Sequence, residues 1–508
     1  MVQKYIIFFE IPQKKSNFAS FKMESLKEKT AKGLLWGGMS NGIQQLLNLL
    51  FGIFLARMLS QTDYGMIGML AIFSAIAADM QSGGFISALN RKETVTHQDY
   101  NAVFWTSILV SIAFYLLFFF TAPLIARFYG VPELEPLARY SFLSFLIVSF
   151  SIAPRAILFR NMKVRESAII SITAVLLSGC VGLIMAYNGF AYWGIATQQI
   201  VYTAVVSSLN FYFAKWHPTL PVDFSPIKEI FGFSSKLVVT NLITEVNNNI
   251  FSVLLGYLYK PHDVGNYTQA NKWNTMGHSY VTNMLYGIAQ PVFTKVENDP
   301  ERQKKVFRKL LRFTALFCFP LMFGLALVSK EFIVLAITAK WLESAYILQM
   351  LCIAGAFIPI SGLFSNLIIS RGHSSTFMWS TLCLCLVQLA AVYLAASYGI
   401  SGMVWAYVAV NIGWTVVWYT LAHKEIHLSV LEALKDITPY LLLTLVLVIA
   451  AHLITQQLDN LLLRLIAKMA FVGTTYCLAL WLLRSVIFME AVEFLANKIH
   501  FPLFKNRK

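Results

Sequence analysis

Apolar stretches of about 20 residues recur in this chain, and each is long enough to cross a hydrocarbon core about 30 Å thick. They extend from residue 34 to residue 484. Hydrophobic residues make up 57% of the 508 residues and charged residues only 13%, unlike the composition of soluble globular domains. Because helices satisfy their own backbone hydrogen bonds in lipid, the sequence predicts an all-α polytopic membrane protein.

Hydropathy windows predict about fourteen transmembrane helices. Two of them, 64–89 and 265–291, are diluted by polar residues. The predicted spans are 34–57, 64–89, 102–126, 137–158, 167–187, 191–214, 234–258, 265–291, 307–328, 344–370, 376–397, 401–422, 438–455 and 463–484.

Basic residues are divided unevenly between the two sides of the predicted membrane. With the N-terminus in the cytoplasm, 31 of the 40 Lys and Arg residues fall in cytoplasmic tails and loops, and eight fall on the outer side. Lys272 is the one basic residue that lies well inside a predicted span. This asymmetry predicts that both termini are cytoplasmic. Because the net charge of +15 is spread over alternate loops, we expect no nucleic-acid partner.

The densest basic run is KKVFRKLLRF at 304–313. Its pattern predicts an amphipathic helix on the inner face that sets topology and contacts lipid headgroups. The six cysteines all fall within apolar segments and form no CxxC pair, so we expect neither a disulfide framework nor a metal site.

An internal repeat divides the chain. At an offset of 200 residues, SNGIQQLLNLLFGIFLARMLSQTDYG (40–65) aligns without a gap with TNLITEVNNNIFSVLLGYLYKPHDVG (240–265). The identical pairs include Asn41 with Asn241, Asn48 with Asn248, Asp63 with Asp263, and Gly65 with Gly265. Six helices per copy give both copies the same orientation, as in secondary transporters with a central site.

The repeat predicts six segments. They are an N-terminal cytoplasmic tail (1–33), an N-lobe (34–214), a cytoplasmic linker (215–233), a C-lobe (234–422), two further helices (423–484) and a cytoplasmic C-terminal tail (485–508).

Polar residues recur on one face of the first helix in each copy. In the second copy Asn241, Glu245 and Asn248 are spaced by four and three residues, so they share a helix face. The equivalent stripe in the first copy contains Asn41, Gln45 and Asn48. Because lipid cannot hydrogen-bond such groups, we expect the two stripes to line one central cavity.

The chain resembles the multidrug/oligosaccharidyl-lipid/polysaccharide flippase superfamily, and within it the polysaccharide transporter (Wzx-type) branch. The resemblance is carried by LARMLSQTDYGMIGM (55–69), YTQANKWNTM (267–276), AQPVFTKVENDPE (289–301), FPLMFGLA (319–326), AKWLESAYILQML (339–351) and SRGHSS (370–375). Within these motifs, Asp63, Gly65, Tyr267, Ala270, Pro291, Trp341 and Gly372 are expected to shape loops and helix ends.

The resemblance implies two six-helix lobes around a cavity. It also implies translocation of undecaprenyl-pyrophosphate-linked oligosaccharides across the bacterial inner membrane by alternating access, for surface polysaccharide biosynthesis. The expected partners are that substrate, membrane lipids and the glycan polymerase or export machinery. No cofactor is expected, although some members of the superfamily couple to Na⁺ or H⁺. Basic residues grip the pyrophosphate in relatives, whereas the cavity expected here is rich in amides.

Several polar residues within the spans are candidates for the cavity or for ion coupling, since intramembrane ionisable residues are commonly functional. Interhelical hydrogen bonding or helix capping is the alternative role for each of them. The expected cavity residues are Glu245, Asn248, Asn249, Asn241, Gln45, Asn48, Gln44, Lys272, Asn274 and Asp79. The candidates for cation coupling are Glu245, Gln388, Asn411 and Thr415.

Two other functions stay open at this stage. A cation-coupled multidrug antiporter of the same superfamily would have the same fold. A polysaccharide polymerase or ligase is more distant, because those enzymes resemble proteins with a large external loop, and the predicted outer loops here are short. No phosphate-cradling loop, HExxH motif or nucleophile elbow is present, so we do not expect an enzyme.

Overall fold

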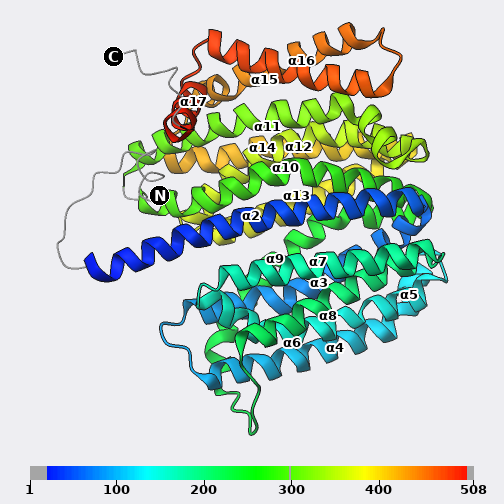
Figure 1. Cartoon of the computed structure of the whole chain (residues 1–508), viewed down its shortest axis with the longest axis vertical. Helices are drawn as coiled ribbons and strands as arrows, with labels where there is room; N and C mark the ends of the chain where they lie inside the picture. The colour runs from blue at the N-terminus through cyan, green and yellow to red at the C-terminus, as the bar shows by residue number, and fades with distance from the viewer. Residues whose placement is uncertain (1–19, 297–298, 500–508) are drawn as a thin grey trace. The chain divides into compact units, whose positions relative to one another are not determined.

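The computed structural model describes residues 20–296 and 299–499 (Figure 1). Within these ranges all regular secondary structure is helical and no strand occurs. Fourteen of the described helices have at least 18 residues, and each of the fourteen predicted spans coincides with one of them. The prediction of an all-α polytopic fold is confirmed.

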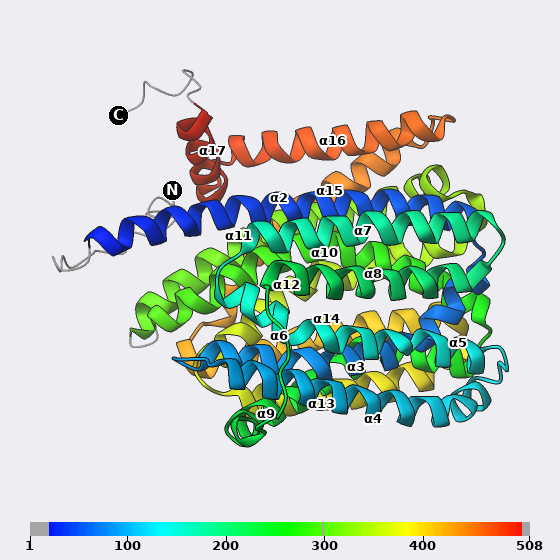
Figure 2. The same ribbon diagram turned by 60° about the horizontal axis from the view of Figure 1, so that its bottom comes forward.

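Contacts between Cα atoms divide the chain into two compact units, Met1–Gly265 and Asn266–Lys508. The helices of the first unit are α2 (Ser20–Met58), α3 (Gln61–Arg91), α4 (His97–Tyr129), α5 (Leu134–Ser141), α6 (Leu143–Arg160), α7 (Val164–Tyr187), α8 (Ala191–Ala214) and α9 (Ser225–Leu258). The first turn of α10 (Pro261–Lys295) also belongs to it. Helix α7 packs against both α2 and α8, as Figure 2 shows.

The second unit holds the rest of α10 and the remaining helices. They are α11 (Pro300–Ile337), η1 (Ala339–Trp341), α12 (Leu342–Ser370), α13 (Ser374–Leu394), η2 (Ala395–Tyr398), α14 (Gly399–Ile426), α15 (Val430–Thr455), α16 (Leu461–Leu482) and α17 (Val486–Ile499). Helices α15 and α16 form a hairpin, and both pack against α11.

The predicted lobes, 34–214 and 234–422, rest on the sequence repeat and stay a prediction. Grouping by contacts instead places α9 in the first unit, where it packs against α3 and α4. Helix α9 begins within the range predicted as a linker, and α17 lies within the range predicted as a C-terminal tail.

Nine helical stretches of the described chain are long and apolar enough to cross a membrane. One of them, Ser374–Ile426, contains both α13 and α14. The long helices α3, α8, α9 and α10 are not among the nine stretches, and polar residues dilute the spans predicted for α3 and α10. The chain is a multi-pass membrane protein.

Equivalent aspartates of the repeat cap two helices. The backbone N–H of Ser60 donates to Oδ2 of Asp63 at 2.8 Å, and the N–H of Asp63 donates to Oγ of Ser60 at 3.3 Å, which forms a capping box at α3. At the start of α10, the N–H of Lys260 donates to Oδ2 of Asp263 at 3.2 Å. The carboxylates satisfy backbone donors that a helix start leaves open.

Two arginines hold helix ends on the side predicted to be cytoplasmic. Nη1 of Arg160, the last residue of α6, donates to the carbonyl oxygens of Leu89 and Lys92 at 2.9 and 2.7 Å. Arg371, just after α12, donates from Nε to Oε1 of Gln303 at 3.0 Å. Guanidinium groups suit this role because they carry several donors in a fixed fork.

The basic run 304–313 is helical as predicted, and its predicted contact with lipid headgroups stays a prediction. The run is not a separate interfacial helix but part of the continuous helix α11. Arg308 donates from Nε to Oδ2 of Asp436 at 2.7 Å and pairs with Glu432 at 3.0 Å, and Lys304 pairs with Glu432 at 2.8 Å. The acidic residues lie on α15, whose packing against α11 supplies partners that the local sequence did not reveal.

Candidate functional site

A cavity of about 540 Å³ lies within the first unit. It is lined by residues of α2, α3, α5, α6, α7 and α8. Its polar lining residues are Gln44, Asn48, Ser74, Ser141, Ser144, Ser178, Gln198, Gln199, Tyr202 and Thr203. No Lys, Arg, His, Asp or Glu residue of the described chain lines it. The cavity therefore offers amides and hydroxyl groups without a formal charge.

Helical spacing explains how α2 and α8 supply so many of these groups. Gln44 and Asn48 are four residues apart on α2, so they share one face. The same interval separates Gln198 from Tyr202 on α8. Nε2 of Gln44 also donates to Oγ of Ser40 at 2.9 Å, which fixes one end of the amide.

Several cavity hydroxyl groups donate to the carbonyl oxygen three residues earlier in the chain. Oγ of Ser144 donates to Ser141 at 2.7 Å, and Oγ1 of Thr203 donates to Ile200 at 2.8 Å. Each hydroxyl hydrogen is then used, while the oxygen keeps lone pairs that can accept a hydrogen bond. In contrast, Oγ of Ser141 is buried and has no partner in the described chain.

Two glycines of α7 let the neighbouring helices approach. A Cβ atom on Gly179 would lie 2.5 Å from the ring of Phe51 on α2. A Cβ atom on Gly182 would lie 3.0 Å from Oε1 and 3.2 Å from Cβ of Gln198. The absence of a side chain at Gly182 therefore leaves the space that Gln198 occupies beside the cavity.

The cavity contains only part of the predicted stripe on α2. Of the stripe, Asn48 lines the cavity, whereas Asn41 and Gln45 do not. Gln44, which was expected in the cavity but was not part of the stripe, also lines it. Asn41 is exposed and Gln45 is half-buried. Gln44 and Asn48 are four residues apart on the helix, whereas the predicted stripe contained Gln45 in place of Gln44.

The polar residues of α9 lie outside this cavity. Glu245 is half-buried, and its carboxylate accepts a hydrogen bond from Nδ2 of Asn249 at 3.4 Å. Asn241 is also half-buried, and Asn248 is exposed. Of the two predicted stripes only α2 residues line this volume, and a central cavity shared by both stripes stays a prediction.

In the second unit, Lys272 is half-buried, and its ammonium lies 5.8 Å from the centre of the Trp273 ring. No acidic side chain of the described chain forms an ion pair with it. Asn274 is buried, and its Oδ1 has no hydrogen-bond partner among the described residues. Gly355 leaves room for it, since a Cβ atom there would lie 2.4 Å from this Oδ1.

The other three coupling candidates also belong to the second unit. Both ends of the Gln388 amide are buried without a partner in the described chain. Nδ2 of Asn411 donates to the carbonyl of Tyr407 at 2.8 Å, and Oγ1 of Thr415 lies 2.7 Å from Oγ of Ser361. A cation site that combines these residues with Glu245 stays a prediction. The side chain of Asp79 lies outside the described residues.

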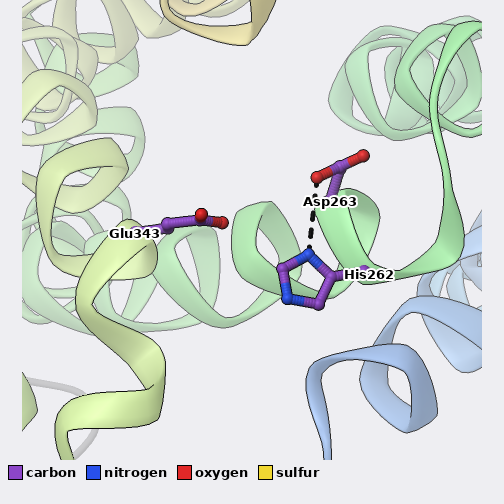
Figure 3. Close-up of side chains that lie close together, drawn as sticks. All are labelled: His262, Asp263 and Glu343. Atoms are coloured by element: carbon purple, nitrogen blue, oxygen red, sulfur yellow. Dashed lines mark hydrogen bonds and ion pairs between the residues drawn. The ribbon is translucent and has the colours of Figure 1, made fainter.

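Figure 3 draws His262, Asp263 and Glu343. Nδ1 of His262 lies 3.5 Å from Oδ1 of Asp263, whose other oxygen caps α10. In the second unit, Oε2 of Glu343 accepts a hydrogen bond from Nδ2 of Asn266 at 2.5 Å. Both carboxylates therefore accept hydrogen bonds from residues at the start of α10. We assign no metal ion to them.

A buried ion pair in the second unit was missed from the sequence. Nζ of Lys468 on α16 lies 2.6 Å from Oε1 of Glu331 on α11, and the side chains are 6% and 3% exposed. The sequence singled out Lys272 as the one basic residue well inside a predicted span, and it did not reveal that Lys468 is buried in an ion pair. Glu331 lies beyond the predicted span 307–328. Helix α11 continues to Ile337, however, and Glu331 is one of its buried residues.

The amides of α8 were also missed. Gln198 and Gln199 stand side by side in an apolar span, and this local pattern was visible in the sequence. They lie outside the stretch aligned at an offset of 200 residues, so the comparison of the two halves did not select them.

A family model described as "Polysaccharide biosynthesis protein" matches residues 54–346, which is more than half of the chain. The chain belongs to this family. The lipopolysaccharide biosynthesis protein WzxC of Escherichia coli is 23% identical over 355 residues, covering 69% of the chain and 71% of WzxC. The teichuronic acid biosynthesis protein TuaB of Bacillus subtilis is 23% identical over 396 residues, covering 77% of the chain and 81% of TuaB.

Solved structures of two membrane transporters share the fold of this chain. The lipid II flippase MurJ in an inward closed conformation matches with a TM-score of 0.72 and 16% identity, covering 89% of the chain and all of MurJ. An inward-facing multidrug resistance MATE family transporter of the MOP superfamily matches with a TM-score of 0.62 and 16% identity, covering 76% of the chain and 94% of the transporter. At these identities the two structures establish the fold of the chain and nothing further.

Proposed function

We propose that this protein is a flippase for lipid-linked oligosaccharides. It would move undecaprenyl-pyrophosphate-linked units from the inner to the outer leaflet of the bacterial cytoplasmic membrane, with both termini in the cytoplasm. The observation that carries the proposal is the cavity inside an otherwise apolar bundle, whose described lining residues offer amides and hydroxyl groups and no formal charge. Family membership and the similarity to the succinoglycan biosynthesis transport protein ExoT of Rhizobium meliloti support a glycan as the cargo.

The chemistry of the cavity matches a carbohydrate. Sugar hydroxyl groups both donate and accept hydrogen bonds, and amide side chains do the same. Burying such groups without partners is costly, so an apolar bundle needs a polar lining to pass a glycan. The polyprenyl tail would remain in lipid, while alternating access exposes the glycan site to each side of the membrane in turn.

Lys272 and Glu245 have separate roles in the proposal. The ammonium of Lys272, which forms no ion pair in the described chain, would contact the pyrophosphate, since phosphate oxygens bind strongly to charged donors. Glu245 would couple transport to a Na⁺ or H⁺ gradient. A carboxylate within a span is costly to bury, and residues of this kind are commonly functional. No cofactor is part of the proposal, and a glycan polymerase or export complex is the proposed downstream partner.

The proposal describes a transporter rather than an enzyme. On the predicted outer side, connections such as residues 188–190 and 456–460 are short. A polymerase or ligase acting on the same lipid-linked substrates would need catalytic residues on a large external segment.

A transport assay in sealed vesicles tests the proposal. The purified protein is reconstituted with undecaprenyl-pyrophosphate-linked oligosaccharide, and a glycan-specific reagent reports how much glycan reaches the opposite leaflet. We expect movement of glycan that depends on the protein, and no efflux of a cationic dye. The MATE-like fold makes a multidrug antiporter the second candidate. Dye efflux without glycan movement would reject the flippase function and favour the multidrug antiporter.

A further inference from the structure

The cavity of the first unit distinguishes between kinds of glycan. Its lining includes four amides on α2 and α8 near the hydroxyl groups of α6 and α7, and among the described lining residues only Tyr202 carries an ionisable group, a phenol. A carboxylate placed there would lose its hydration and would find no cation among the described lining residues, which is a large cost. A neutral sugar would instead exchange hydrogen bonds with water for hydrogen bonds with amides and hydroxyl groups.

The size of the cavity suits a small ligand. Its volume of about 540 Å³ lies within the range of roughly 300–1,000 Å³ found for small-molecule sites. The side of the cavity formed by α8 depends on Gln198, which lies against the bare backbone of Gly182. Any side chain at position 182 would press on Gln198 and narrow the cavity.

We propose that this cavity is a subsite for one neutral sugar residue, and that Gly182 sets the size of sugar it accepts through Gln198. The inference rests on the proposed function, because it identifies the part of the glycan that the first unit binds. The pyrophosphate and acidic sugars such as uronic acids would stay outside the subsite. Gly182 is a positioning residue, since it acts through Gln198.

Cysteine protection tests whether the cavity is wet and binds sugar. Ser178, which lines the cavity, is replaced by Cys in a background where the exposed cysteines Cys180, Cys383 and Cys477 are replaced by Ala. The matched control is Ser167→Cys, which lies on the same helix but is exposed and outside the cavity. If Ser178→Cys does not fold, Ser74→Cys provides a second position in the lining.

Three probes are compared in the labelling experiment. They are polyprenyl pyrophosphate carrying one neutral hexose, the same lipid carrying one hexuronic acid, and the bare polyprenyl pyrophosphate. We expect a small maleimide to label the cavity cysteine, and the hexose probe to slow labelling at least about fivefold, which corresponds to occupancy of most sites. The acidic and bare probes should leave the rate unchanged, as should every probe at Ser167→Cys. An unreactive cavity cysteine, or equal protection by the bare lipid, would overturn the proposal.

Transport by size variants supplies an independent readout. In Gly182→Ala we expect transport of an N-acetylhexosamine-linked lipid to fall about tenfold more than transport of the hexose-linked lipid, as one added carbon in a fitted pocket can do. The double variant Gly182→Ala/Gln198→Ala should recover transport of the N-acetylhexosamine-linked lipid. Gly42→Ala is the control, since a Cβ atom there meets nothing within 4 Å.

The outcomes separate the two proposals. If the wild-type protein moves neither lipid-linked sugar, the flippase function fails. If it moves both sugars and Gly182→Ala does so in the same ratio, the function stands and the subsite is wrong.

Discussion

Gly65 of α3 and Gly265 of α10, 200 positions apart in the chain, meet in a reciprocal backbone contact. A Cβ atom on Gly65 would lie 1.7 Å from the carbonyl oxygen of Pro261, and one on Gly265 would lie 1.8 Å from the carbonyl oxygen of Gln61. Gln61 and Pro261 are also 200 positions apart, so equivalent residues of the repeat make equivalent contacts. Two identities found by alignment thus meet as partners in the folded chain.

This contact predicts a severe effect for Gly65→Ala. The obstructing atoms belong to the backbone and cannot rotate away, so the helix starts must separate. We expect the free energy of unfolding to fall by about 3 kcal/mol, the upper end for overpacked sites. Thermal unfolding in detergent, followed by tryptophan fluorescence, measures the loss. Gly42→Ala, which lies in open space, should not be destabilised. Equal melting temperatures for Gly65→Ala and the wild type would contradict the prediction.

The pair Glu331–Lys468 predicts a strong asymmetry between single and double variants. Lys468→Met leaves a buried carboxylate without its cation, so we expect a loss of about 3–5 kcal/mol in unfolding free energy. Replacing both residues in Glu331→Leu/Lys468→Met removes both charges and should restore most of that loss. The same thermal assay checks this result. A double variant as unstable as Lys468→Met would show that the pair does not act through charge compensation.

The contact between α11 and α15 predicts that Asp436 contributes more to the stability of the fold than an exposed acidic residue does. Asp436 is 2% exposed and accepts hydrogen bonds from Arg308 and Arg312. In Asp436→Asn the two guanidinium groups lose their buried anion, and we expect a loss of about 2 kcal/mol. The control is Glu135→Gln, which breaks an exposed pair with Arg139 and should change stability by at most about 0.5 kcal/mol. Similar losses in both variants would argue against a special role for Asp436.

The coupling role proposed for Glu245 predicts that its charge is required. We expect both Glu245→Gln and Glu245→Ala to lower glycan transport about tenfold, equivalent to about 1.4 kcal/mol. Asn249→Ala removes the amide that donates to Glu245 but keeps the carboxylate, so its transport should stay within about twofold. The vesicle assay described above measures all three variants. Full transport by both Glu245 variants would remove this residue from the mechanism.

The helices were predictable because their signal is local. Each long apolar run predicts a span without reference to the rest of the chain. The helix predicted at 191–214 has the same bounds as α8. Helix ends outside the hydrocarbon carry polar residues, so hydropathy alone did not place them. For this reason α11 and α15 begin earlier than their predicted spans.

The candidate site was only partly predictable. The sequence placed Asn48 on a polar face of α2 and named Gln44 as a further cavity candidate, and both residues line the cavity of the first unit. Sequence reasoning matched that face with the stripe around Glu245, although the cavity is completed by α8 and by hydroxyl groups of α6 and α7. A repeat shows which positions are equivalent, but it does not show which helices pack together.

The sequence by itself determined the membrane-spanning helical fold and the repeat, because hydrophobic length and residue identity are properties of single segments. Only the tertiary structure decided that Glu331 meets Lys468 and that Gln198 lies against Gly182. Both contacts join different helices, and the cost of burying a polar group depends on the partner that packing brings to it.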